Sequence, residues 1–115
     1  MVIVLGILFS SKKFEKECNT YRLLIKKHGK RRARRIHARL DDLRAAANLE
    51  MMRHLPGRCH ELKGDRAGQL SLDLDHPYRL IFEPANNPVP RKEDGGLDWG
   101  SVTAILIIDV EDTHE

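Results

Sequence analysis

Five side chains in the second half of the chain could handle a phosphate group or a proton: Lys63, Arg66, Arg79, Asp112 and His114. Arg79 is the most informative, because it stands within an alternating segment between Tyr78 and Leu80. A guanidinium on the polar face of a strand presents a fixed fork of donors that suits a phosphate. His114 follows the last apolar segment, and an imidazole exchanges protons near neutral pH.

A run of basic residues in the first half contains no acidic residue. Eight Lys and Arg lie within fourteen positions: Lys26, Lys27, Lys30, Arg31, Arg32, Arg34, Arg35 and Arg39. A solvated helix usually mixes charges of both signs, since like charges four residues apart destabilise it. We therefore expect this run to bind nucleic acid through phosphate contacts, which carry no sequence information.

The net charge of +3 over 115 residues hides a division of the chain. Residues 1–60 hold fifteen Lys and Arg against five Asp and Glu, a balance of +10. Residues 61–115 hold five against twelve, a balance of −7. The length predicts one domain over residues 1–115, and the basic first half predicts a surface that faces a polyanion.

Two amphipathic helices joined at Gly29 are predicted in that first half, over about residues 11–27 and 30–52. Each has one apolar stripe at helical spacing. The stripes are Phe14, Cys18, Tyr21 and Ile25 in the first, and Ala33, Ile36, Leu40, Leu43 and Ala47 in the second. Neither helix can bury its stripe alone, so both must cover a sheet.

The sheet is predicted from four segments. Residues 2–9 are apolar nearly throughout, which is typical of a strand buried on both faces. Residues 69–74 and 78–83 alternate and form a hairpin, while 101–110 form a strand inside the sheet. Residues 84–100, rich in Pro and Gly, form a long exposed loop. This order predicts an α+β fold, with a helical hairpin on one face of a small, mostly antiparallel sheet.

Several classes of function are disfavoured. His54, Cys59 and His60 lie too close together for a zinc site and lack a second spaced pair, so no metal is expected. No nucleotide-binding or hydrolase motif occurs, so no cofactor is expected either. No segment reaches the ~20 apolar residues of a membrane helix. Without targeting features, we expect a cytoplasmic protein with two reduced, mostly buried thiols.

Three segments resemble HigB-type killer proteins of the RelE/ParE toxin superfamily. The segment Leu55–Gln69 is similar to the centre of these proteins, and Tyr78–Glu83 is similar to their central hairpin strand. The tail from Asp109 to His114 resembles a closing motif of Asp, an aromatic residue and His. Here Thr113 stands at the aromatic position.

The resemblance implies a toxin of a type II toxin–antitoxin system. It implies a ribosome-dependent mRNA endoribonuclease that needs no metal and leaves a 2′,3′-cyclic phosphate. Lys63 and Arg79 would clamp the phosphate, and Asp112 and His114 would transfer or orient protons. A cognate antitoxin would be the protein partner, and ribosomal RNA would contact the basic run. Operator DNA would be reached through the antitoxin complex.

Two other readings stay open from the sequence. The chain could be a non-catalytic toxin that inhibits DNA gyrase. It could also be a weakened family member that chiefly binds its antitoxin and operator DNA, which Thr113 favours because threonine neither stacks on a base nor serves as a strong acid or base. The helices lack the spacing of a helix-turn-helix, so the chain is not expected to read DNA itself.

Overall fold

A computed structural model describes residues 3–113. Within them, five strands form one mixed sheet in the order β1-β5-β4-β3-β2. The strands are β1 (Gly6–Phe9), β2 (His60–Glu61), β3 (Leu70–Asp73), β4 (Tyr78–Pro84) and β5 (Ala104–Asp112). β1 runs parallel to β5, and the other pairings are antiparallel. The predicted α+β class is therefore confirmed.

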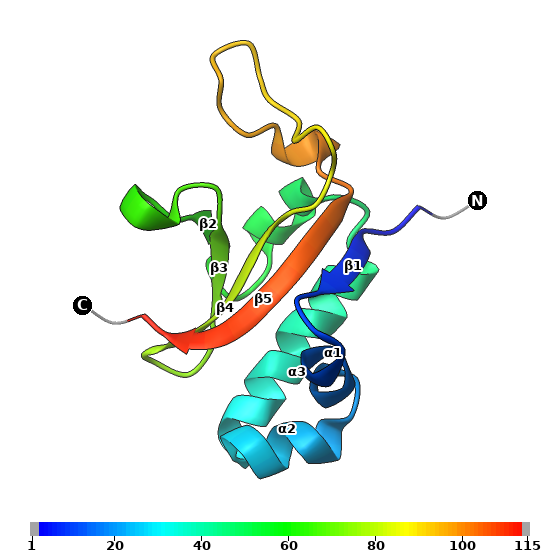
Figure 1. The fold of residues 1–115 in the computed structure, drawn as a ribbon, viewed down its shortest axis with the longest axis vertical. Helices are drawn as coiled ribbons and strands as arrows, with labels where there is room; N and C mark the ends of the chain where they lie inside the picture. The colour runs from blue at the N-terminus through cyan, green and yellow to red at the C-terminus, as the bar shows by residue number, and fades with distance from the viewer. Residues whose placement is uncertain (1–2, 114–115) are drawn as a thin grey trace.

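Three helices lie together on one side of the sheet (Figure 1): α1 (Lys12–Cys18), α2 (Tyr21–His28) and α3 (Lys30–Ala45). The α3 stripe is fully buried at Ala33, Ile36, Leu40 and Leu43, as its spacing predicts. It joins one hydrophobic core with alternate residues of the strands, among them Leu72, Leu80 and Phe82. The sheet thus buries one face against the helices, and the other face carries most of the polar side chains of β3 and β4, together with the buried Ile81.

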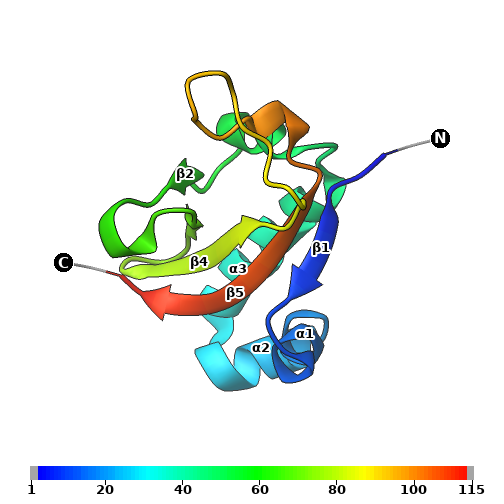
Figure 2. The same ribbon diagram turned by 45° about the horizontal axis from the view of Figure 1, so that its top comes forward.

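The first predicted helix is two helices, because the chain breaks at Asn19 and Thr20. Thr20 has extended backbone angles, and its carbonyl accepts the N–H groups of Leu23 and Leu24, which starts α2. The break rotates the second helix, so that Leu24 is fully buried while Tyr21, which the single-helix pattern placed in the core, is 37% exposed. Figure 2 shows α1 and α2 as separate helices.

The second predicted helix ends early, at Ala45 instead of near residue 52. The Ala46 carbonyl accepts a hydrogen bond from Leu5 N at 2.7 Å, and Leu49 N donates to the Val102 carbonyl at 3.1 Å. These long-range bonds take over backbone groups that a longer helix would use. A 3₁₀ turn over Leu49–His54 follows.

The strand predicted for residues 2–9 is neither that long nor buried on both faces. β1 begins at Gly6 and lies at the edge of the sheet, beside β5 only. Ile7 and Phe9 pack against the core, whereas Leu8 is 57% exposed. The prediction of a strand buried on both faces was wrong, because the outward-facing side of β1 is open to solvent at Leu8. By contrast β5 lies between β1 and β4, as its apolar residues on both faces predict.

The loop predicted over residues 84–100 projects from one end of the sheet (Figure 1), but it is anchored. Leu97 and Trp99 are buried. The Trp99 indole N–H donates to the Glu61 carboxylate at 3.0 Å, and the Arg53 guanidinium lies 3.7 Å from the ring centroid. The loop therefore has a fixed base next to β2.

Replacing Leu40 by Ala should lower the free energy of unfolding by about 2–5 kcal/mol, because a fully buried side chain would leave a cavity in the core. Urea denaturation followed by circular dichroism measures the change. Arg34→Ala, on the exposed side of the same helix, is the control and should stay within about 0.5 kcal/mol. Equal effects of the two substitutions would show that the α3 register is wrong.

Candidate functional site

A row of charged side chains crosses the sheet on the face away from the helices, which we call the site face. Asp73, Arg79 and Glu111 are direct cross-strand partners on β3, β4 and β5. Partners that face each other across strands share one face. The Arg79 Nε lies 3.4 Å from a carboxylate oxygen of Asp73. Arg79 thus stands mid-sheet between two carboxylates, on the polar face that the alternation predicts.

Arg58 brings a second guanidinium to this row from the turn before β2. Its Nε donates to Asp73 Oδ2 at 2.9 Å. The Arg58 backbone has a φ of 48°, in the left-handed region that costs an L-residue about 1–2 kcal/mol. Such strain persists only where the surroundings impose it, and it gathers at functional sites. With Leu74 and His76, Arg58 and Arg79 line a small hollow of about 90 Å³.

A third guanidinium, that of Arg66, reaches the site face from the segment between β2 and β3. It is ion-paired with Glu111, and its other nitrogen donates to Gln69 Oε1 at 3.2 Å. Lys63 begins the same 3₁₀ turn, Gly64–Arg66, and its side chain is exposed. Three guanidiniums therefore form ion pairs with two carboxylates on this face, which leaves one positive charge in excess within this cluster.

His60 adds an imidazole to this face, a placement that no pattern in the sequence predicts. It pairs with Ser71 on β3, and Ser71 pairs with Ile81 on β4, two residues from Arg79 on the same face. Its Nδ1 lies 2.8 Å from the Arg58 carbonyl oxygen. A carbonyl only accepts, so Nδ1 carries a proton, and in the neutral imidazole Nε2 is then the acceptor.

The closing tail differs from the expected arrangement. β5 brings Glu111 beside Arg79, while Asp112 pairs with Tyr78, whose side chain packs against the core. Alternation therefore assigns Asp112 to the opposite face from Arg79. Thr113 N donates to the Pro77 carbonyl, and its buried hydroxyl has no hydrogen-bond partner in the described structure. His114, expected to transfer protons, lies outside the described residues.

One member of the predicted nucleic-acid-binding run, Arg39, is internal. Its side chain is 7% exposed, and its Nε donates to the Asp73 carbonyl at 2.9 Å. Burial lowers the pKa of its guanidinium, with a smaller contribution from Arg35. Gly57 packs directly on it with a φ of +111°, and a Cβ there would lie 2.6 Å from Arg39 Nε. Arg39 therefore supports the site from the core side of the sheet and does not lie on a surface that could contact phosphate.

Arg32 is also committed to an internal contact. Its guanidinium donates to both Asp75 oxygens, at 3.0 and 3.2 Å, and lies 3.4 Å from the centroid of the Tyr78 ring. This contact fastens the start of α3 to the turn between β3 and β4. The turn carries His76, next to the hollow beside Arg79.

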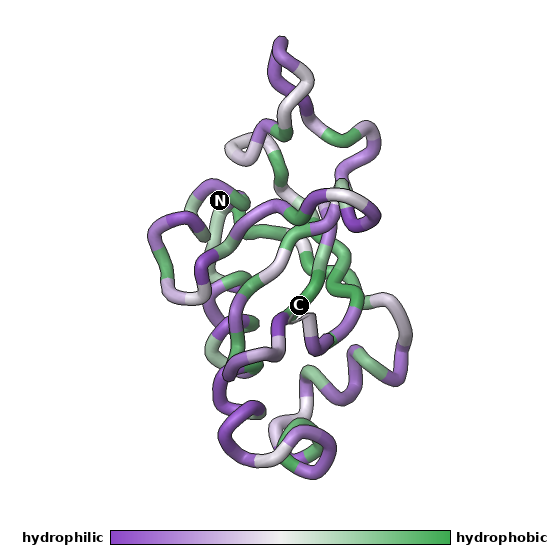
Figure 3. The backbone as a smooth tube through the Cα atoms, turned by 90° about the vertical axis from the view of Figure 1, so that its left-hand side faces the viewer, coloured by the Kyte–Doolittle hydropathy of each residue, from purple (hydrophilic) through white to green (hydrophobic). Residues whose placement is uncertain are grey.

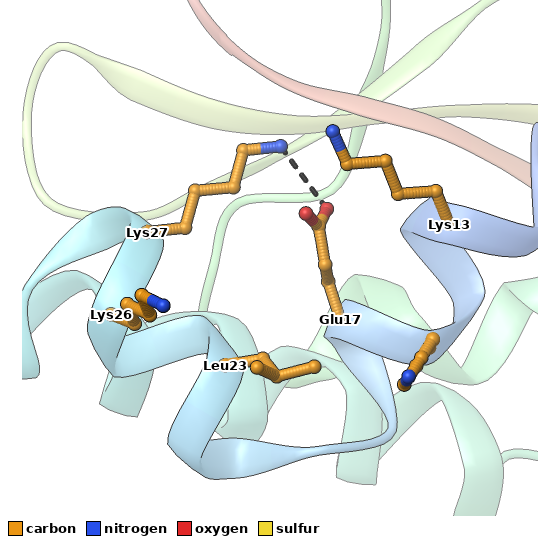
Figure 4. A pocket seen from close by; sticks show the side chains of 6 residues that line it. Lys13, Glu17, Leu23, Lys26 and Lys27 are labelled. Atoms are coloured by element: carbon orange, nitrogen blue, oxygen red, sulfur yellow. Dashed lines mark hydrogen bonds and ion pairs between the residues drawn. The ribbon is translucent and has the colours of Figure 1, made fainter.

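The rest of the run is exposed: Lys26, Lys27, Lys30, Arg31, Arg34 and Arg35. In Figure 3 the backbone at this helical end is mostly hydrophilic. A cleft of about 580 Å³ between α1 and α2 adds Lys13 and Lys16 to Lys26 and Lys27. Figure 4 shows Lys27 reaching across this cleft to Glu17, at 3.1 Å. Positive charge thus continues from α3 onto α1.

Further features of the described residues concern metal ligands, membrane-spanning helices and reactive thiols. Between residues 3 and 113, no three His, Cys, Asp or Glu side chains gather as metal ligands would. No helix in that range is long and apolar enough to cross a membrane. Cys18 is buried and Cys59 half-buried, both free, and burial raises the pKa of each thiol to about 12. Both thiols are therefore poor nucleophiles.

Arg39→Ala should lower the free energy of unfolding by about 2–4 kcal/mol, because it removes a charged hydrogen bond and leaves the Asp73 carbonyl unpaired. Arg35→Ala, exposed on the same helix, should change it by less than about 0.5 kcal/mol. Chemical denaturation of both variants measures the difference. If both proteins unfold at the denaturant concentration of the original, Arg39 does not support β3.

No model of a known protein family and no curated protein sequence matches the chain. Solved structures do. A YoeB/ParE toxin from Agrobacterium tumefaciens has 13% identity and a TM-score of 0.58, over 96% of this chain and 100% of that one. A chain of a YoeB–YefM complex from Staphylococcus aureus has 19% identity and a TM-score of 0.53, over 96% of this chain and 98% of that one. A YoeB dimer from that organism has 21% identity and a TM-score of 0.52, over 96% and 98%. The chain therefore has the RelE/ParE-like fold of the YoeB/ParE toxins.

Proposed function

We propose that this chain is a HigB-type toxin of a type II toxin–antitoxin system, acting in the cytoplasm as a ribosome-dependent mRNA endoribonuclease. The observation that carries the proposal is the gathering of Arg58, Arg66 and Arg79 on one sheet face, beside His60. The fold shared with YoeB/ParE toxins supports the toxin role. The resemblance of Leu55–Gln69 to HigB proteins supports the subclass.

The chemistry proposed is attack by a ribose 2′-OH on the adjacent phosphorus. A bond forms between the 2′-oxygen and phosphorus, and the bond from phosphorus to the 5′-oxygen breaks, giving a 2′,3′-cyclic phosphate and a 5′-OH. Arg79 and Lys63 would hold the phosphate, and Arg79 would stabilise the charge that builds on its oxygens. Asp73 and Glu111 fix the guanidiniums before substrate arrives, so little reorganisation is needed.

Two proton transfers complete the reaction. His60 Nε2 is proposed to accept the 2′-OH proton, because its Nδ1 is already engaged with the Arg58 carbonyl. The leaving 5′-oxygen needs a donor, and His114, which follows β5 in the sequence, is proposed for that role. Asp112 is proposed to orient the tail that carries it.

The exposed residues of the basic run are proposed to hold ribosomal RNA by phosphate contacts: Lys26, Lys27, Lys30, Arg31, Arg34 and Arg35. Their separation from the site face lets the chain bind the ribosome while the site face receives mRNA. A protein antitoxin is the proposed partner, with operator DNA bound through it. The similarity to a chain of a YoeB–YefM complex supports a protein partner of this kind.

A second function is favoured by one observation. Thr113 stands where the resembling motif has an aromatic residue, and its hydroxyl is buried and unpartnered in the described structure. It is therefore not placed to contact RNA. This favours a non-catalytic module that binds its antitoxin or inhibits gyrase.

Arg79→Ala should slow mRNA cleavage by about 10²–10³, as loss of a preorganised donor does. His60→Ala should slow it by about 10²–10⁴ as loss of a general base. The measurement is mapping of mRNA 5′ ends in a reconstituted translation system. Lys92→Ala and His54→Ala, which remove an exposed basic side chain and an exposed histidine, are the controls. Absence of cleavage by the original protein would favour the non-catalytic module.

Replacing Arg31, Arg34 and Arg35 with Gln should weaken binding to ribosomes and flatten its dependence on salt. Each lost phosphate contact should reduce the slope of log K against log salt by roughly 0.7–0.9. The control triple, Lys12, Arg22 and Lys92 to Gln, removes equal charge elsewhere. Sedimentation with ribosomes across a salt series measures the slope of log K against log salt for each triple variant. Equal slopes for both variants would rule out a specific ribosome-binding surface on the basic run.

A further inference from the structure

A pocket of about 230 Å³ lies at the end of the sheet where β4 leads into the loop of residues 85–98. It is smaller than the roughly 300–1,000 Å³ of sites for drug-sized ligands, so it suits a group such as one nucleobase. Leu70, Val89 and Leu97 supply apolar wall, and Glu61, Glu83 and Arg91 supply polar groups. The proposed function leaves this pocket without a role.

Two of those polar groups, Glu83 and Arg91, have no polar side-chain partner within the described residues. Glu61 accepts the Trp99 indole N–H at 3.0 Å. In the described structure, neither the half-buried Glu83 carboxylate nor the Arg91 guanidinium forms a hydrogen bond or an ion pair. The two carboxylate oxygens of Glu83 and the guanidinium donors of Arg91 therefore line one pocket without a hydrogen bond between them. A half-buried carboxylate without partners is costly, and a ligand with donors offsets that cost.

The pocket lies within reach of an RNA strand bound at Arg79. Glu83 is four residues from Arg79 along β4, a separation of about 13 Å at roughly 3.3 Å per residue. That distance corresponds to about four stacked nucleotides at 3.4 Å each, and to fewer when bases are splayed out for recognition.

We propose that this pocket binds a guanine base of the RNA, a few nucleotides from the cleaved phosphate. Guanine presents two adjacent donors, N1–H and N2–H, that match the Glu83 carboxylate. It also presents two adjacent acceptors, O6 and N7, that match the Arg91 guanidinium. No other common base offers paired donors beside paired acceptors. This inference rests on the proposed function for its substrate, but its binding step needs no catalysis.

The test uses short 2′-O-methyl RNA oligonucleotides that differ at one base, since they lack the attacking hydroxyl and are not cleaved. Trp99 is the single tryptophan of the chain and contacts Glu61 of the pocket, so its fluorescence reports on occupancy. Calorimetry gives the affinity directly. The guanine oligonucleotide should bind about 10-fold to 100-fold more tightly than its cytosine, adenine or uracil counterparts.

Glu83→Gln should remove that preference, because an amide cannot accept two hydrogen bonds side by side. Glu93→Gln is the matched control, an exposed residue of the same loop, and should keep the preference. Equal affinity for all four oligonucleotides, or an unchanged preference in Glu83→Gln, would overturn the guanine pocket. If the original protein cleaves mRNA but shows no preference for guanine, only the guanine pocket is ruled out. If it prefers guanine but does not cleave mRNA, only the ribonuclease function is ruled out.

Discussion

The hydrogen bond from the buried Arg39 guanidinium to the Asp73 carbonyl is the contact on which the site depends. It joins α3 to the end of β3 through the core side of the sheet. Asp73 N donates in turn to the Gly57 carbonyl at 2.7 Å, and Gly57 packs on Arg39 where no larger residue fits. Asp73 is therefore held by its main chain, and its carboxylate can fix Arg58 and Arg79 on the other face. A charged side chain buried in the core thus positions the charged side chains that face solvent.

Charge alone could not show which residues of the basic run are exposed and which are buried, as Arg39 illustrates. Its distance of three residues from Ile36 and four from Leu43 puts it beside the apolar stripe, a signal that the count of basic residues obscures. Its partner is a backbone carbonyl, which no sequence pattern marks. Likewise, the apolar residues at 2–9 indicate a strand but not its place at the sheet edge, since strand order depends on contacts between distant segments.

The site was predictable in part for similar reasons. Alternation along residues 78–83 placed Arg79 on the polar face, and the structure agrees. The partners of Arg79 depend on strand register, and register brings Glu111 beside it, a carboxylate that the sequence did not single out. His60 could not be placed on this face from the sequence, because β2 has only two residues, too few for any periodicity. Its place on the site face follows only from pairing with Ser71.

The fold is shared with YoeB/ParE toxins, but a fold can host several activities, so the chemistry rests on the site face. In the proposed reaction, the arginine cluster presents a phosphate to the neighbouring 2′-OH. The most direct measurement uses a ribosome-bound mRNA with a single 2′-deoxynucleotide at the mapped cleavage position. We expect the all-ribose mRNA to be cut to a 2′,3′-cyclic phosphate and the single deoxynucleotide to abolish that cut. Equal cutting of both messages, or a product without the cyclic phosphate, would contradict the proposed reaction.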